Sequence, residues 1–367
     1  MHISENNRLP QDFGVIDFNR RLKSWYLESH RPLPWRETKD PYKIWLSEVI
    51  LQQTRVAQGL PYYERFTEQY PTVFDLAAAD ERDVLRLWQG LGYYSRARNM
   101  HFTARQVVED YNGRFPESAE KLLKLKGLGQ YTAAAIASFA FNEAVPAIDG
   151  NVYRVMARIF GIQADMLSNE GKKEFAALAR QLVPKDDPAT YNQAMIEFGA
   201  LQCVPASPNC AACIFNDRCF AYEHGMQGQL PVKIKKLTIK HRFLNYFIIR
   251  QGNRLAMHER LARDIWSGLY DFYLIETRTP ATTLDHLTIP EPIFQNLLSK
   301  GTIQEVPKVY SHILTHQRLQ VRFWWLEIPE TERIDLPPGL AFYDDKEVEV
   351  LPKPILIDTV LREENYL

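Results

Sequence analysis

The spacing of apolar residues changes near residue 225, and this change sets the fold classes open to the chain. Before it, apolar side chains such as Phe18 and Leu22 recur three or four positions apart, which is the spacing of amphipathic helices. After it, the apolar runs 243–250 and 255–258 flank a Gln-Gly-Asn turn, a pattern typical of a β-hairpin. We therefore expect a multi-domain protein with an all-α first part and an α/β second part.

The length fits two domains, because 367 residues exceed the usual size of one domain. We predict a helical domain at 1–225, a linker at 226–244 and an α/β domain at 245–367. The second domain is expected to contain a strand at 322–328 and helices at 290–300 and 357–365. The predicted linker holds five basic and no acidic residues, which indicates either a basic linker or an ordinary solvated charge run. The basic residues are Lys233, Lys235, Lys236, Lys240 and Arg242.

Composition narrows the class of protein further. With 46% hydrophobic and 24% charged residues, the chain can bury a core and is not expected to be disordered. Its net charge of −1 does not by itself predict a nucleic-acid partner. No apolar run is long enough to cross a membrane, and residues 1–11 are too polar for a signal peptide. We expect a cytoplasmic protein of bacterial type with no membrane partner.

All four cysteines lie in the segment 203–219, in the pattern C-x6-C-x2-C-x5-C. Four thiolates in one loop can surround a metal centre, whereas disulfides are rare in a reducing cytoplasm. Only one pair has the close spacing of structural zinc sites, so the pattern favours a 4Fe-4S cluster while zinc stays the alternative. With four protein ligands and no open position, such a cluster would be structural. The predicted ligands are Cys203, Cys210, Cys213 and Cys219.

A glycine-containing turn connects two apolar segments within 122–141, and its second helix is expected to start near Thr132. Gly127 and Gly129 allow the backbone to approach another molecule closely, and the first N–H groups of a helix attract anions. The segment resembles a helix-hairpin-helix phosphate clamp. A plain helix-turn-helix connection is the alternative.

Two carboxylates stand out in the helical part. Glu48 has apolar neighbours on both sides, which should desolvate it and raise its pKa, as suits an acid that holds a proton near neutral pH. Asp149 precedes the helix that starts near Asn151, where an aspartate is commonly an N-cap. The alternatives to catalytic roles are therefore a surface glutamate and a helix cap.

Taken in order, five motifs resemble those of the MutY-type adenine DNA glycosylases, in the helix-hairpin-helix base-excision superfamily. They are the runs 48–54 and 90–99, the hairpin, Asp149-Gly150-Asn151 and the cysteine pattern. The resemblance implies a monomeric enzyme of base-excision repair that acts on double-stranded DNA and removes adenine mispaired with 8-oxoguanine or guanine. The rival classes are a bifunctional oxidised-pyrimidine glycosylase and a non-catalytic iron-sulfur redox sensor that binds DNA.

The resemblance also implies the chemistry. Glu48 would protonate adenine N7, Asp149 would stabilise the oxocarbenium ion, and Asn151 would orient Asp149. Tyr131 stands where the related endonuclease III enzymes carry a lysine nucleophile, so a monofunctional glycosylase is expected. Tyr131 also resembles the tyrosine that positions the catalytic carboxylates in the family.

Other residues match the family's base pocket and its wedges in the DNA stack. Gln193 matches a pocket position that is Glu or Gln in the family, and Gln53 and Tyr93 resemble the wedges. Tyr93 could instead be a core residue beside Tyr94. The residues that resemble the pocket wall are Arg31, Leu33 and Trp35.

In the second part, the run 266–272 resembles the W-x-G-L-x-x-F motif of Nudix-like domains, but the acidic motif of Nudix hydrolases is absent from the sequence. A binding role is therefore expected. The segment 312–319 aligns with the Phe-Ser-His loop that reads 8-oxoguanine in the family, which assigns the reading to Thr315 and His316. Leu314 and Thr315 depart from the family's Phe and Ser, so the degree of selectivity stays open.

Overall fold

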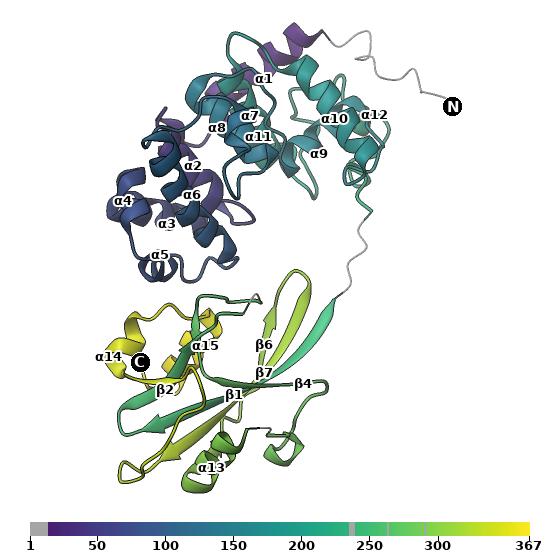
Figure 1. The fold of residues 1–367 in the computed structure, drawn as a ribbon. Helices are drawn as coiled ribbons and strands as arrows, with labels where there is room; N and C mark the ends of the chain where they lie inside the picture. Colours follow the sequence, from purple (N-terminus) through teal and green to yellow (C-terminus); the bar gives the residue numbers. More distant parts are fainter. Residues whose placement is uncertain (1–13, 235–238, 263, 290) are drawn as a thin grey trace. The chain divides into compact units, whose positions relative to one another are not determined.

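The computed structural model describes residues 14–234, 239–262, 264–289 and 291–367. The chain divides into two compact units (Figure 1). The first consists of Met1–Ala78 and Asn99–Lys235, and the second of Ala79–Arg98 and Lys236–Leu367. Lys235 and Lys236 of the predicted basic linker lie outside the described residues. Within the described residues, no helix has the length and apolar character needed to span a membrane.

The described part of the first unit is helical, as the apolar spacing predicted. Its elements are α1 (Val15–Ser29), η1 (Pro34–Arg36), α2 (Pro41–Ile50), α3 (Val56–Gln69), α4 (Val73–Ala78), most of α6 (Ser95–Tyr111), α7 (Ala119–Leu122), α8 (Gln130–Phe141), α9 (Gly150–Phe160), α10 (Asn169–Leu182), α11 (Pro188–Leu201) and α12 (Phe220–Glu223). Side-chain caps set several starts. The carboxylates of Asp40 and Asp187 accept backbone N–H groups at the starts of α2 and α11, and each is followed by proline at the first helical position.

The cysteine segment is anchored in the core of this unit. Phe215, which lies between the third and fourth cysteines, is fully buried. Its ring stacks on Phe18 of α1 at 4.9 Å and meets Phe198 of α11 edge-on at 5.4 Å. Residues of α9 and α10 complete the same hydrophobic cluster. Apolar packing therefore holds this loop against the helices of the unit.

The second unit contains a mixed eight-stranded sheet. Its strands are β1 (Lys240–Gln251), β2 (Arg254–Glu259), β3 (Tyr270–Asp271), β4 (Tyr273–Thr277), β5 (Thr302–Glu305), β6 (Tyr310–Ile313), β7 (Gln317–Ile328) and β8 (Ala341–Asp344). The central pair β1 and β7 is parallel, and the other pairs are antiparallel. The predicted hairpin is the β1–β2 pair, and the predicted strand at 322–328 is the second part of β7. β1 begins inside the predicted linker, where Lys240 pairs with Gln317 of β7. Arg242 of the predicted basic run is buried there in ion pairs with Asp264 and Glu276.

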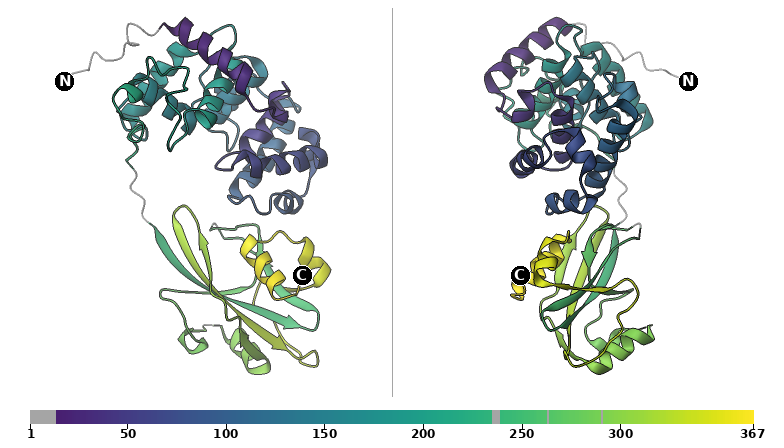
Figure 2. Two further views of the ribbon diagram at one scale, coloured as in Figure 1. Left: turned by 180° about the vertical axis from the view of Figure 1, so that it is seen from behind. Right: turned by 60° about the vertical axis from the view of Figure 1, so that its left-hand side comes forward.

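Helices pack on both faces of this sheet (Figure 2). α13 (Pro292–Lys300) places Phe294 against Phe247 of β1, with the ring centroids 4.9 Å apart. The helix α15 (Ile355–Glu363) lies on the other face, next to α14 (Asp345–Val350), while η2 (Leu284–His286) is a short turn. Of these, α13 and α15 match the helices predicted at 290–300 and 357–365 to within a few residues.

The second unit also includes residues that the sequence assigned to the helical domain. The segment 79–98, with α5 (Glu81–Leu87) and the start of α6, belongs to it. Gln89 accepts a hydrogen bond from the backbone N–H of Lys353 at 3.3 Å, and the guanidinium of Arg82 lies over the Tyr270 ring. These contacts join residues more than 150 positions apart. Domains predicted as continuous ranges of sequence could therefore not include segment 79–98 in the second unit.

Candidate active site

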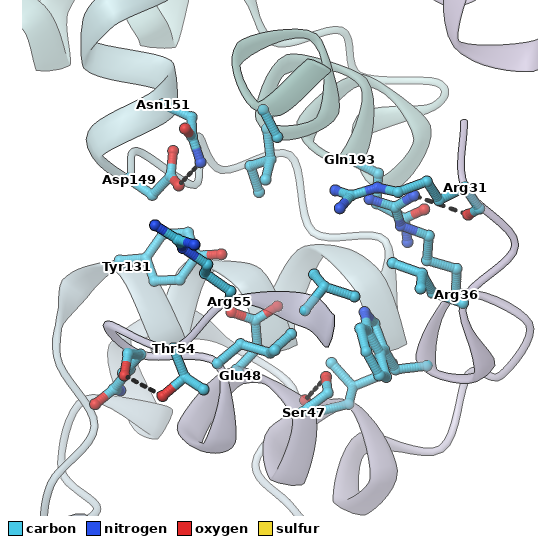
Figure 3. A pocket seen from close by; sticks show the side chains of 18 of the residues that line it. Arg31, Arg36, Ser47, Glu48, Thr54, Arg55, Tyr131, Asp149, Asn151 and Gln193 are labelled. Carbon is cyan, nitrogen blue, oxygen red and sulfur yellow. Dashed lines mark hydrogen bonds between the residues drawn. The ribbon is translucent and has the colours of Figure 1, made fainter. Parts of the chain in front are cut away.

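A pocket of about 820 Å³ lies in the first unit and gathers most of the predicted catalytic and base-binding residues (Figure 3). Gln193, Arg31 and Arg36 line one side of it, and Tyr131, Asp149 and Asn151 the other. Glu48 points into it from α2. Of the other predicted pocket and wedge residues, the lining includes Leu33, Trp35 and Gln53.

Glu48 is partly buried, between the buried residues Ser47 and Val49. The pKa of its carboxyl is raised to about 7, chiefly by burial. The charge of Asp149 adds to the rise, while a hydrogen bond from Tyr131 and the charge of Arg36 oppose it. A carboxyl with this pKa is substantially protonated at neutral pH. Burial also raises the pKa of Tyr131 well above its ordinary value, so the phenol keeps its proton for the bond to Glu48.

Asp149 is both a helix cap and a pocket residue. Its Oδ1 accepts the backbone N–H of Val152 at 2.8 Å, which starts α9. Its Oδ2 accepts a hydrogen bond from Nδ2 of Asn151 at 2.7 Å, as the predicted orienting role requires. Burial raises the pKa of Asp149, and these hydrogen bonds oppose the rise. The N-cap geometry of Asp149, the alternative to a catalytic role, is therefore also what directs its carboxylate into the pocket.

Arg154 is a residue of this network that the sequence did not single out. Its Nη2 donates to Oδ1 of Asn151 at 2.8 Å, and its Nε donates to the backbone carbonyl of Cys203 at 2.7 Å. A continuous set of hydrogen bonds thus links Asp149 to the first cysteine of the cysteine segment. The sequence signal was a pair of basic residues, Arg154 and Arg158, one turn apart among the apolar residues of α9.

The predicted wall residues Arg31, Leu33 and Trp35 line this pocket, and Leu33 and Trp35 are buried. Gln193 accepts a hydrogen bond at Oε1 from the phenol of Tyr26 at 2.6 Å. The sequence missed Glu197, which is fully buried behind the wall and binds the guanidinium groups of Arg31 and Arg36. An acidic residue in the apolar helix α11, one turn after Gln193, was the available signal.

The glycine turn has the geometry expected of the hairpin. Gly127 has φ +80°, and a Cβ there would lie only 2.8 Å from that of Asn99, so glycine is required. Gly129 is the N-cap of α8, where no side chain caps the helix and a Cβ would meet nothing within 4 Å. The first N–H groups of α8 are therefore open to an anionic ligand.

The two predicted wedge residues share an unusual backbone. Gln53 has φ +55° and Tyr93 has φ +50°, a left-handed conformation that is uncommon for residues other than glycine. Tyr93 is 47% exposed, so it is not a core residue. In the second unit its Oη lies 2.6 Å from Oγ1 of Thr315, and both Thr315 and His316 are exposed.

The four cysteines form no disulfide, and each is partly buried. Among the described residues, the structure groups no set of three or more His, Cys, Asp or Glu side chains in metal-binding geometry. The sulfur of Cys213 accepts the backbone N–H of Phe215 at 3.4 Å, and that of Cys203 lies 3.6 Å from a guanidinium nitrogen of Arg158. Burial raises the pKa of the Cys213 thiol to about 12, and the charges of the other three cysteines add to the rise. N–H donors beside the sulfurs, as at Cys213 and Cys203, are surroundings that metal-bound thiolates need.

The fold and the pocket, together with two family matches, show that the chain is a base-excision DNA repair protein. Residues 46–185 match the family described as HhH-GPD superfamily base excision DNA repair protein, and residues 245–363 match the NUDIX domain family. The chain belongs, more particularly, to the adenine DNA glycosylase family. It is 32% identical over 265 residues to the adenine DNA glycosylase of Buchnera aphidicola subsp. Schizaphis graminum (strain Sg), an alignment that covers 72% of this chain and 76% of that one. The predicted family and the Nudix-like second domain are thereby confirmed.

Two further relatives set the extent of the likeness. The adenine DNA glycosylase of Arabidopsis thaliana is 34% identical over 309 residues, which are 73% of this chain and 48% of that protein. The chain therefore spans about half the length of the plant relative. A solved structure of a thermostable thymine-DNA glycosylase matches with a TM-score of 0.54 and 30% identity, covering 57% of this chain and 97% of that one.

Proposed function

We propose that this protein is a monofunctional adenine DNA glycosylase, which removes adenine opposite 8-oxoguanine or guanine by hydrolysis of the N-glycosidic bond. The observation that carries the proposal is the joint placement of Glu48 and Asp149 in one pocket, with Tyr131 hydrogen-bonded to Glu48. Family membership supports the adenine substrate. We further propose that the protein acts as a monomer on double-stranded DNA.

Glu48 acts as the general acid. Adenine is a poor leaving group until a ring nitrogen is protonated, and a carboxyl with a pKa of about 7 can donate that proton at neutral pH. Asp149, oriented by Asn151, stabilises the positive charge that develops on the sugar as the bond breaks. That charge favours the ionised form of Asp149 and opposes the effect of burial on its pKa. Water attack, assisted by Glu48 after it has lost its proton, completes the hydrolysis.

The pocket offers no amine for a Schiff base. None of its described lining residues is a lysine, and Tyr131 occupies the position expected of the nucleophile in bifunctional relatives. This favours hydrolysis over strand cleavage. Replacing Tyr131 with lysine is expected to create covalent trapping by borohydride on abasic DNA.

DNA contacts come from several parts of the chain. The hairpin glycines 127 and 129 and the N-terminus of α8 suit a backbone phosphate. Gln53 and Tyr93 would fill the gap that the extruded base leaves in the DNA stack, while the wall of the pocket and Gln193 would hold adenine. In the second unit, Thr315 and His316 would read the damaged partner base.

The cysteine segment would hold a 4Fe-4S cluster through Cys203, Cys210, Cys213 and Cys219. A bound cluster would supply a covalent link that fixes this loop, with no role in the bond cleavage itself. Arg154, which binds the Cys203 carbonyl and Asn151, would carry the position of the loop to the catalytic carboxylate. The purified protein is expected to be brown and to contain iron and sulfide in equal amounts, whereas a colourless, active zinc protein would contradict the cluster.

A strand-cleavage assay tests the proposal as a whole. A labelled duplex with adenine opposite 8-oxoguanine should be cut only after alkaline treatment, because a monofunctional enzyme leaves an intact abasic strand. A duplex with thymine in place of adenine is the matched control. Cleavage without alkali, or loss of thymine at the same rate as adenine, would contradict the proposed reaction.

A further inference from the structure

Glu197 ties the pocket wall to α11. Its side chain is 0% exposed, while those of Arg31 and Arg36 are 36% and 10% exposed. From Arg31 it accepts the backbone N–H at 3.0 Å, Nε at 2.8 Å and Nη2 at 2.5 Å. From Arg36 it accepts Nη1 at 2.9 Å and Nη2 at 2.6 Å. One buried carboxylate therefore fixes both ends of the short segment that carries Leu33 and Trp35.

The same carboxylate sets the charge of this side of the pocket. Burial alone would raise the pKa of Glu197, but the hydrogen bonds from Arg31 and Arg36 outweigh it and lower the pKa to about 2. Glu197 is therefore ionised at neutral pH. Together the three side chains leave one positive charge in excess, and removal of the carboxylate charge would leave two.

Excess positive charge here bears directly on Glu48. The groups around Glu48 are Tyr131 from α8, Asp149 at the start of α9 and Arg36 from η1, while Arg31 and Arg55 line the same pocket. Among them the charge of Arg36 favours the ionised form of Glu48, and Asp149 opposes it. A stronger positive field from the wall would favour loss of the proton that the acid must hold.

We propose that Glu197 is a positioning residue of the adenine pocket, which holds the 31–36 wall in place and offsets the arginine charge so that Glu48 keeps its proton. This inference rests on the proposed role of Glu48 as the acid. It assigns to Glu197 a function in the reaction although its side chain does not line the pocket.

The test is the pH dependence of single-turnover adenine release from the duplex with 8-oxoguanine, measured on the full-length protein with substitution Glu197→Gln. We expect the fall in rate on the alkaline side to move to lower pH, with about a tenfold loss of rate above it for each pH unit of displacement. Acidification should restore much of the rate. Glu197→Asp keeps the charge and should keep the wild-type position of the fall, and Glu109→Gln, on an exposed residue of α6, is the control.

A loss of rate in Glu197→Gln that is the same at every pH, with the alkaline fall unmoved, would overturn the inference. Glu197 would then only support the packing of the wall and would not affect the protonation of Glu48. The double variant Glu197→Gln with Arg36→Gln restores the net charge, so its alkaline fall should return towards the wild-type pH. This variant also carries the test if two unpaired arginines prevent the single variant from folding, and a fall that stays displaced in it would overturn the inference.

The two possible failures are distinguishable. If Glu48→Gln retains the wild-type rate, or the wild type shows no alkaline fall, the proposed acid is wrong and the inference falls with it. If Glu48→Gln is inactive and the wild-type fall is present but unmoved by Glu197→Gln, only the role of Glu197 is wrong.

Discussion

The two units place carboxylates in opposite surroundings. In the first, burial raises the pKa of Glu48 and of Asp149, and both point into an open pocket. In the second, Asp271 is 0% exposed and is bound by Arg260 at 2.7 Å and by the phenol of Tyr246 at 2.8 Å. A carboxylate fixed by a cation on the inside of a domain serves the fold, whereas one desolvated beside a pocket is available for proton chemistry.

The largest expected effect is on the reaction itself, through the two carboxylates of the first unit. Glu48→Gln and Asp149→Asn should each lower single-turnover adenine release by about 100- to 10,000-fold, because they remove the proton donor or the anion and keep the shape. Binding to the mispaired duplex should change little, since contacts to phosphates and to the partner base remain. Rates from quenched reactions and affinities from gel shifts measure the two effects separately.

The exposed substitution Glu109→Gln is the matched control for these variants. Affinity that falls in parallel with the rate would assign Glu48 and Asp149 to the fold instead of the reaction. Asp149 carries the greater risk of this outcome, because it also caps α9.

On the other side of the comparison, Asp271→Asn should destabilise the second unit by roughly 3 to 5 kcal/mol, since it removes the buried carboxylate of an ion pair and leaves Arg260 only its longer ion pair with Asp264 at 3.4 Å. Chemical unfolding followed by tryptophan fluorescence measures the change. Asp285→Asn, at an exposed position of the same unit, should alter stability by less than about 0.5 kcal/mol. Equal stabilities of the two variants would show that the buried ion pair is not structural.

A smaller effect is expected where the second unit meets the partner base. Thr315→Ala combined with His316→Ala should reduce the preference for 8-oxoguanine over guanine by about 1 to 3 kcal/mol, as expected for lost hydrogen bonds to the damaged base. The ratio of single-turnover rates and affinities on the two duplexes is the measurement. A ratio that is unchanged would place the reading of damage outside this hairpin.

Point substitutions test this division of labour better than removal of residues 226–367. The segment 79–98 belongs to the second unit, so a truncated chain would expose the surfaces of α5 that pack there. Loss of discrimination in the truncated protein would then mix damage recognition with a disturbed helical part. The variant Thr315→Ser, which keeps the hydroxyl and restores the family's residue, is the conservative control.

The sequence predicted the helical and β-rich parts because their apolar spacings differ, and it predicted Glu48 because its apolar neighbours imply desolvation. The structure supports that reasoning with a pKa of about 7. Family resemblance was needed to connect Glu48 with Asp149, since residues 101 positions apart carry no local signal of contact. Spacing also could not decide between a cap and a catalytic role for Asp149, because one geometry serves both.

The contacts that could not be predicted from the sequence are those made by buried charged residues. Glu197 and Arg154 have no motif, and each acquires its meaning from partners on other elements. The same holds for the segment 79–98, whose place in the second unit depends on long-range contacts such as that of Gln89 with Lys353. Charged residues in apolar helices are therefore the sequence feature that most merits a search for distant partners.

The last prediction joins stability to the chemistry of Glu48. Its folded pKa of about 7 lies above the ordinary 4.5, so the folded state binds a proton that the unfolded state releases between these values. The contribution is fully present below pH 4.5 and is lost as the pH rises through 7. Glu48→Gln should therefore gain stability relative to the wild type as the pH increases, by on the order of 1 to 2 kcal/mol at pH 8 after allowance for solvent screening of a partly exposed group. Denaturant unfolding at pH 5 and pH 8 measures it, with Glu109→Gln as the control. A difference that is the same at both pH values would mean that Glu48 is ionised in the folded protein and cannot be the acid.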